Sequence, residues 1–367
     1  MLPDHAIYLA ESKAITGRRL AGAGQPGPQG PAPGGAPPLL RTALVALGLL
    51  VVAAGAARLV QRQVDAARAA RWPAPGQLVA AGVLRLHVHC MGAGGPTMVL
   101  EAGMGGWSQD WSLVQARLAT QGRVCSYDRA GYGWSGDGAA TRDGRAMVEQ
   151  LRQALAAAHV DGPYLLAGHS MGGLLVGLYA RSHPREVAGL AFVDAVGRDY
   201  AAQFPPQAYR DFRAGLGRLL AVADTLAPLG LPQALGQPAS LVAARLPADV
   251  RDCAVDFSQR PRQYTALRAE NAGFDAMLAQ ARQAGPLPRV PTVVLSSSVM
   301  RDFPPGLESS AMRVAWQLNQ DSIAREAGVR RVIFSDTGHF LHVERPDAVV
   351  AVLAAWRQQV RVANGKQ

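Results

Sequence analysis

Short apolar runs alternate with helical stretches along residues 77–362, and this alternation limits the folds that the 367-residue chain can adopt. Buried strands are expected at Val124–Tyr127, Tyr164–Ala167, Leu190–Val193, Val293–Leu295 and Val332–Phe334. Helices are expected between most of them, for example at Arg145–Ala158 and Leu174–Arg181. Continuously apolar strands are buried on both faces, which is typical of a parallel sheet between layers of helices. The pattern predicts an α/β fold with a mostly parallel sheet covered by helices on both faces.

Two more strands and one insertion complete this domain. Val83–His89 alternates between apolar and polar residues, and Thr97–Leu100 is a short apolar run that enters a glycine-rich loop. Residues from about 198 to 288 interrupt the alternation, because they are rich in Leu, Ala and Arg and helical in pattern. They are expected to form a helical cap inserted between two strands of the sheet.

The N-terminal region has a different composition. Residues 17–38 consist mainly of Gly, Pro, Ala and Gln, so residues 1–38 are expected to be a disordered tail. Residues 42–57 carry no charge and, as a helix rising ~1.5 Å per residue, would reach about 24 Å. Apolar neighbours extend this run to a predicted transmembrane helix at residues 39–60, followed by a linker at residues 61–76.

Two other interpretations of the apolar run remain open, as does the side of the membrane. Residues 54–56, Ala-Gly-Ala, resemble a signal-peptidase site, and a buried core helix is the third alternative. We expect a single-pass membrane protein with an N-terminal anchor. Arginines within residues 58–71 favour a cytoplasmic catalytic domain, whereas basic residues within 13–19 and a signal-anchor helix would favour export.

Charge and cysteine content exclude several classes of protein. The formal net charge is +10, of which residues 1–75 contribute +5, and the other 292 residues carry +5 without a basic cluster. A nucleic-acid-binding protein would concentrate this charge on one patch or helix, so no nucleic-acid partner is expected. Cys90, Cys125 and Cys253 form no Cys-x-x-Cys pair, and we expect all three to be small buried apolar residues.

The segment Pro163–Gly173 carries the strongest chemical signal. An apolar strand leads into Gly168-His169-Ser170-Met171-Gly172, and a helical stretch follows. This is the G-x-S-x-G pattern in the strand–turn–helix context that exposes a nucleophilic serine. Glycines are needed two positions before and after Ser170 because side chains there would clash at so sharp a turn. Ser170 is therefore the predicted nucleophile.

A serine hydroxyl needs a general base, and His339 is the predicted one. It follows the last expected strand in the segment SDTGHFLHVERPDAV, residues 335–349, which places an imidazole at the edge of the sheet where Ser170 emerges. His342 is the nearest rival and is expected to pack beside the loop. His169 adjoins the nucleophile, but the Ser170 hydroxyl is expected to point away from it.

An oxyanion formed at the site needs two backbone N–H donors. The first is expected from Met171, the residue after the nucleophile, at the N-terminus of the following helix. The second is expected from Met104 in the glycine-rich loop Glu101–Gly106.

Five ordered motifs now resemble a known family. VLEAGMGGWSQDW, CSYDRAGYGWS, YLLAGHSMGGLL, GLAFVDA and GHFLHVERPDAVV are similar to motifs of the alpha/beta hydrolase-1 type of α/β-hydrolases, over about residues 78–360. The usual His-Gly before the oxyanion residue is Ala102-Gly103 here, as in a bacterial branch with Glu-Ala-Gly. The usual Gly-x-x-Asp after the penultimate strand is SSSVMRD. The resemblance implies that Asp128–Ser135 is a structural loop near the pocket, so Ser135 is not the nucleophile.

The acid that orients His339 has two candidates. Asp194 directly follows the strand Leu190–Val193, and Asp302 comes seven residues after Leu295. The resemblance favours a position after the penultimate strand, but its usual spacing falls on Val299 or Met300. Asp194 lies at a strand end itself, and haloalkane dehalogenases of similar layout can use an acid there. We predict Asp194.

These residues predict a serine hydrolase, most simply a carboxylic-ester hydrolase that needs no metal or organic cofactor. Its partner would be a small ester-like molecule, and the leucines of the cap suggest an apolar acyl or alcohol group (Leu216, Leu219, Leu220, Leu226, Leu229 and Leu231). Lactone hydrolysis, C–C bond hydrolysis, perhydrolysis and an inactive ligand-binding protein remain alternatives. Epoxide hydrolases and haloalkane dehalogenases place Asp where this chain has Ser170.

Overall fold

The computed structural model describes residue 27 and residues 37–138, 142–235, 246–299 and 309–364. The chain divides into two compact units, residues 1–52 and 53–367. Most of the predicted tail, residues 1–38, lies outside the described residues, as do parts of the predicted cap and Asp302.

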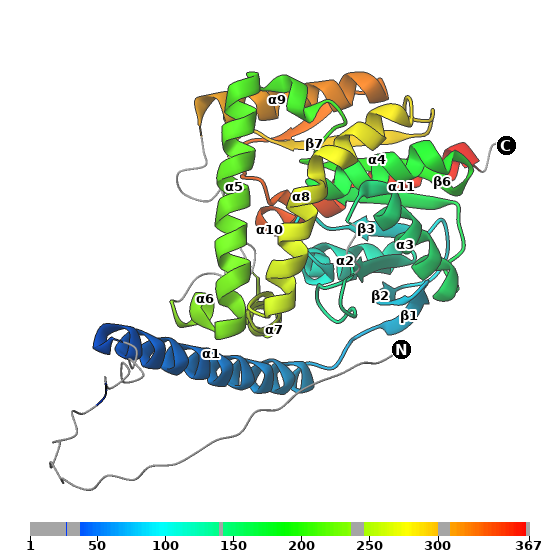
Figure 1. The fold of residues 1–367 in the computed structure, drawn as a ribbon. Helices are drawn as coiled ribbons and strands as arrows, with labels where there is room; N and C mark the ends of the chain where they lie inside the picture. Colours follow the sequence, from blue (N-terminus) through cyan, green and yellow to red (C-terminus); the bar gives the residue numbers. More distant parts are fainter. Residues whose placement is uncertain (1–26, 28–36, 139–141, 236–245, 300–308, 365–367) are drawn as a thin grey trace, which may run out of the picture. The chain divides into compact units, whose positions relative to one another are not determined.

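Helix α1 (Pro38–Arg71) contains the apolar run (Figure 1). It is the one described helix long and apolar enough to cross a membrane, and none of its apolar window is buried. The helix continues through residues 61–71, which were expected to be a linker, because Gln, Asp, Ala and Arg in this stretch all permit a helix and no Gly or Pro interrupts it.

Within the described residues of the second unit, eight strands form one sheet in the order β1-β2-β4-β3-β5-β6-β7-β8. They are β1 (Gln77–Ala81), β2 (Leu84–Met91), β3 (Met98–Glu101), β4 (Val124–Asp128), β5 (Tyr164–His169), β6 (Val187–Val193), β7 (Thr292–Ser297) and β8 (Arg331–Phe334). The two pairs that involve β2 are antiparallel and the others are parallel. The predicted α/β-hydrolase fold is confirmed, and β1 is an additional edge strand.

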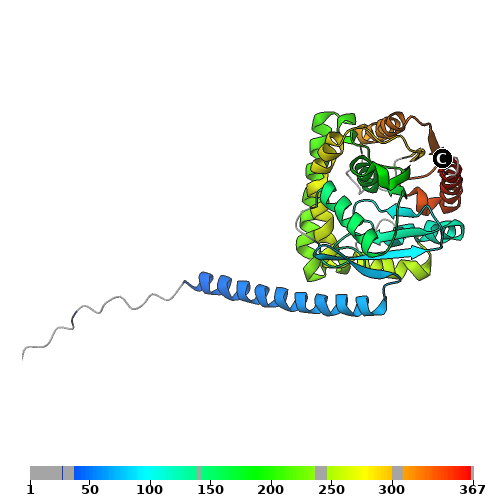
Figure 2. The same ribbon diagram turned by 90° about the vertical axis from the view of Figure 1, so that its right-hand side faces the viewer.

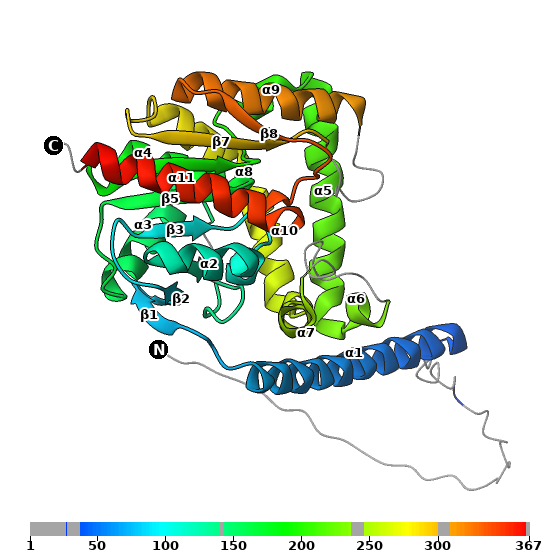
Figure 3. The same cartoon turned by 180° about the vertical axis from the view of Figure 1, so that it is seen from behind.

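Helices cover both faces of the sheet, as Figures 1 and 3 show from opposite sides. One layer contains α3 (Gly144–Ala157), α4 (Met171–Ser182) and α9 (Ser310–Ala327), and the other contains α2 (Ser112–Leu118) and α11 (Pro346–Asn364). The apolar strands pack against both helical layers, because successive side chains of a strand point to opposite faces of the sheet. Leu166 packs on the α3 and α4 side, whereas Leu165 and Ala167 pack on the α11 side.

The predicted insertion between β6 and β7 contains several helices. They are α5 (Pro206–Leu226), α6 (Leu231–Ala234), α7 (Ala248–Ser258) and α8 (Pro261–Gln283). Helix α8 packs against α5 and also against α3 and α4. In Figure 2 the cap helices α5, green, and α8, yellow, lie on one side of the domain and α11, dark red, lies on the other.

Two of the three cysteines are not the free apolar residues that we expected. Cys90 of β2 and Cys125 of β4 are register partners on neighbouring antiparallel strands, and their sulfurs form a disulfide. Facing positions on antiparallel strands bring two Cβ atoms close enough for this bond. Cys253 is a buried free thiol, as expected.

Candidate active site

Ser170 occupies a sharp turn between β5 and α4. Its φ of 53° and ψ of −124° belong to a region that residues with a Cβ rarely adopt. The strand ahead of it and the helix behind it fix this conformation, because Ser170 N–H donates to Val193 O and Ser170 O accepts from Gly173 N–H. Its side chain is half-buried, while the rest of the turn is buried.

The glycines around Ser170 allow three backbone segments to meet. A Cβ at Gly168 would lie 2.3 Å from Gly172 O, and a Cβ at Gly172 would lie 2.5 Å from Glu101 O. A Cβ at Gly103 would lie 3.1 Å from Ser170 Cβ. The loop after β3, which contains Met104, therefore lies directly beside the serine. Met171 is the first residue of α4, at the N-terminal end where helix N–H groups point outward.

His339 lies in the loop between β8 and α10 (Leu341–Glu344), and its Nδ1 is 2.8 Å from Asp194 Oδ2. Asp194 directly follows β6 and has a φ of 42°. Because β5, β6 and β8 are parallel, Ser170, Asp194 and His339 all lie at the carboxyl-terminal edge of the sheet.

The Asp194 carboxylate is fully buried and accepts hydrogen bonds from three further donors. Ser297 donates its backbone N–H at 2.8 Å and its hydroxyl at 3.0 Å to Oδ1, and Trp316 Nε1 donates at 3.0 Å to Oδ2. These donors offset the cost of removing a carboxylate from water and fix its orientation toward His339. Ser297 ends β7 and Trp316 lies on α9, and neither residue was predicted to belong to the site.

The comparisons with known proteins agree with this fold. Residues 96–346 match the family model for the alpha/beta hydrolase fold. The chain belongs to the α/β-hydrolase fold family.

The individual relatives of this hydrolase support the fold, but they do not identify the reaction that it catalyses. YqjL of Bacillus subtilis, an uncharacterized protein, is 36% identical over 114 residues, which cover 31% of this chain and 45% of that protein. A thermophilic esterase from Thermogutta terrifontis superposes with a TM-score of 0.57 at 21% identity over 77% of this chain and 97% of its own. The Cif epoxide hydrolase from Acinetobacter nosocomialis superposes with a TM-score of 0.60 at 14% identity over 82% and 96%.

Two more histidines of the hydrolase lie beside His339, and both are buried. His169 Nε2–H donates to His339 O at 2.9 Å, and the rings of His169 and His342 are 4.4 Å apart. Burial lowers the pKa of His342 to about 3, helped by the nearby His339, and burial lowers the pKa of His169 well below its usual value. Both rings are therefore neutral near pH 7, and His342 packs beside the loop as expected.

A second Ser-His-Asp set lies between β2 and the loop after β4. His87 Nδ1 is 2.9 Å from Asp128 Oδ2, and Ser135 Oγ donates to Asp128 O at 2.5 Å. All three side chains are fully buried, so this set has no access to a substrate. Its hydrogen bonds hold the loop Asp128–Ser135 in place. Among the described residues, no cluster of three His, Cys, Asp or Glu side chains could hold a metal ion.

The contact at Gly172 gives a prediction about stability. In Gly172→Ala the new Cβ would meet two backbone carbonyls, Glu101 O at 2.5 Å and Ala102 O at 2.6 Å, neither of which can rotate away. We expect the free energy of unfolding to fall by about 1–3 kcal/mol, measured by urea denaturation. Gly217→Ala on α5 is the control, since its nearest neighbour is 3.7 Å away, and a gain of about 0.4–1 kcal/mol is expected. Equal effects of the two changes would contradict the prediction.

Proposed function

We propose that this protein is a serine hydrolase that cleaves carboxylic esters through an acyl-enzyme on Ser170. The proposal rests on the contact between His339 Nδ1 and the buried Asp194 carboxylate. This contact lies at the sheet edge where Ser170 forms the turn between β5 and α4. An imidazole fixed by a carboxylate, at the same sheet edge as a serine on a strained turn, is an arrangement that can activate a hydroxyl at neutral pH.

In the proposed reaction the Ser170 hydroxyl attacks the ester carbonyl carbon, and His339 Nε2 accepts its proton. The tetrahedral intermediate collapses to an acyl-enzyme as His339 returns the proton to the leaving alcohol, and water repeats the sequence to release the acid. Asp194 keeps the other imidazole proton on Nδ1 and stabilises the imidazolium. The N–H groups of Met104 and Met171 stabilise the oxyanion, a contribution of about 10²–10³ in kcat per donor.

An apolar group on the ester is favoured by side chains around the loop after β3. Met104 packs against a buried cluster that includes Leu174, Tyr200, Phe274 and Trp316. The cap leucines support this less directly than we expected, because Leu219 and Leu231 are exposed to solvent.

Ser170→Ala tests the nucleophile. We expect the variant to keep its fold by circular dichroism but to lose hydrolysis of p-nitrophenyl esters and labelling by a fluorophosphonate, because the attacking oxygen is gone. Ser135→Ala is the matched control, since Ser135 belongs to the buried second set, and it should still label. Labelling of Ser170→Ala together with loss of labelling in Ser135→Ala would reverse the assignment.

Asp194→Asn tests the acid. Ser297 N–H would hold the Asn carbonyl, so the Asn amide NH₂ would face His339 and Trp316. The His339 proton would then move to Nε2, and the imidazole could no longer accept from Ser170. We expect kcat to fall on the order of 10⁴, measured with a p-nitrophenyl ester. Asp302→Asn should leave kcat nearly unchanged, and the opposite pattern would make Asp302 the acid.

For location, we propose that α1 anchors the protein in a membrane with the hydrolase domain in an oxidising compartment. The apolar window of α1 is long enough and unburied. The arginines after it favour the cytoplasm, but the Cys90–Cys125 disulfide is the stronger argument, because cytosolic thiols are kept reduced.

The protein should therefore stay in the membrane pellet at high salt, since apolar burial and not charge would hold it there. After denaturation without reductant, a maleimide should label Cys253 alone, and after reduction all three cysteines. Release by salt would contradict the anchor, and three reactive thiols without reductant would contradict the oxidising compartment.

A further inference from the structure

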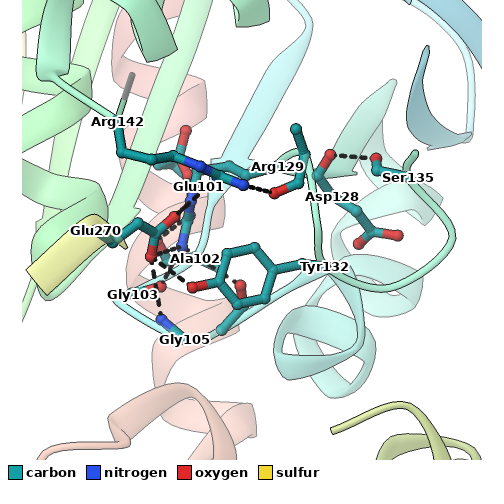
Figure 4. A network of polar contacts seen from close by, with 12 residues as sticks. Glu101, Ala102, Gly103, Gly105, Asp128, Arg129, Tyr132, Ser135, Arg142 and Glu270 are labelled. Carbon is teal, nitrogen blue, oxygen red and sulfur yellow. Dashed lines mark hydrogen bonds and ion pairs between the residues drawn. The ribbon is translucent and has the colours of Figure 1, made fainter. Parts of the chain in front are cut away.

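A buried cluster of charges joins the cap to the loop beside Ser170 (Figure 4). Arg129 follows β4, Glu101 ends β3, and Glu270 lies on cap helix α8. Their side chains are 3%, 1% and 0% exposed, so water screens none of the charges. Arg142 adds a second buried guanidinium, 3.6 Å from Glu270. The cluster therefore contains two cations and two carboxylates. The reaction proposed above uses none of these groups.

Arg129 holds the backbone of the loop as well as the two carboxylates. It donates from Nη1 to Glu101 Oε1 at 2.6 Å and to Ala102 O at 2.9 Å, and from Nη2 to Gly103 O at 2.6 Å. Its Nε donates to Glu270 Oε1 at 2.7 Å. A planar guanidinium can reach all these acceptors at once, whereas a lysine ammonium cannot.

The hydrogen bonds to Gly103 O constrain where the Met104 N–H points, since Arg129 Nη2 and the Gly106 N–H both donate to this carbonyl. The cis peptide bonds of the described residues precede Pro96 and Pro163, so the Gly103–Met104 peptide is trans and planar. In a trans peptide the C=O and the following N–H point in opposite directions. Arg129 holds the carbonyl on one side, so the N–H is presented on the other, and Gly103 lies against Ser170 Cβ.

Glu270 holds the peptide bond that follows Met104. Its Oε2 accepts from Gly105 N–H at 3.3 Å and from the Tyr132 hydroxyl at 2.9 Å, and both of its oxygens contact Arg129. Burial opposes a charge on Arg129, but Glu270 and Glu101 outweigh it and raise the pKa of the guanidinium well above its usual value. The peptides before and after Met104 are therefore held by one charged pair.

We propose that Arg129 and Glu270 are positioning residues that aim the Met104 N–H at the oxyanion and thereby couple cap helix α8 to catalysis. This inference rests on the proposed ester hydrolysis at Ser170. Neither residue touches the substrate; both act through the peptides that flank Met104.

The test is Arg129→Lys, which keeps the charge but cannot hold both loop carbonyls and both carboxylates. With active sites counted by fluorophosphonate titration, we expect kcat to fall about 10²–10³-fold, the loss of one oxyanion donor, with KM changed by less than about threefold. The affinity for a trifluoromethyl ketone, which forms an oxyanion on the serine, should fall by the same factor as kcat.

Arg142→Lys is the matched control, because Arg142 is equally buried and contacts Glu270 and Ala130 O but not the loop beside Ser170. It should retain its kcat and its affinity for the ketone, whatever it does to stability. Should Arg129→Lys fail to fold, Glu270→Gln replaces it, since it keeps the side-chain volume and removes the charge. Glu270→Gln should likewise lower kcat and leave KM nearly unchanged.

An unchanged kcat and ketone affinity in folded Arg129→Lys or Glu270→Gln would overturn the inference. The same loss in Arg142→Lys would also overturn it, because it would show a general effect of the charge cluster. Failure of the proposed function looks different: the unaltered protein would then neither hydrolyse p-nitrophenyl esters nor react with the fluorophosphonate.

Discussion

The close approach of the loop after β3 to the turn at Ser170 is the constraint on which the rest of the site depends. Three backbone segments share a space that excludes a Cβ at Gly168 and at Gly172. The positive φ of Ser170 is stable only because β5 and α4 fix the residues on both sides. The parallel strands β6 and β8 of the same sheet bring Asp194 and the loop with His339 to this edge, so residues that are far apart in sequence meet there.

The second constraint on this architecture is that its buried charges must be compensated. Removing an ion from water costs several kcal/mol, and that cost is offset only where donors and opposite charges surround the ion. Asp194 meets this condition with donors from Ser297, Trp316 and His339, and Arg129 meets it with two carboxylates and backbone carbonyls. Each of these groups is also held in one orientation, which a solvated side chain would not be.

Features encoded within a few consecutive residues could be predicted from the sequence. The apolar strands, the turn at Ser170 and the loop position of His339 all follow from local patterns, and the fold follows from their order. Asp194 and Asp302 could not be separated with certainty, because the direction of an acid at a strand end depends on its backbone angles, and Asp194 has a positive φ. The disulfide was missed because it depends on the register between β2 and β4, which are 35 residues apart at the two cysteines. Glu270 lies on a cap helix with no motif around it.

The position of Glu270 also bears on how such enzymes diversify. An inserted cap is the natural unit to exchange when the substrate range of a hydrolase is to be changed. Here the cap supplies half of the counter-charge of a buried arginine in the core. A transplanted cap without an acid at this place would leave that arginine undercompensated, so cap and core must be chosen together in recombination.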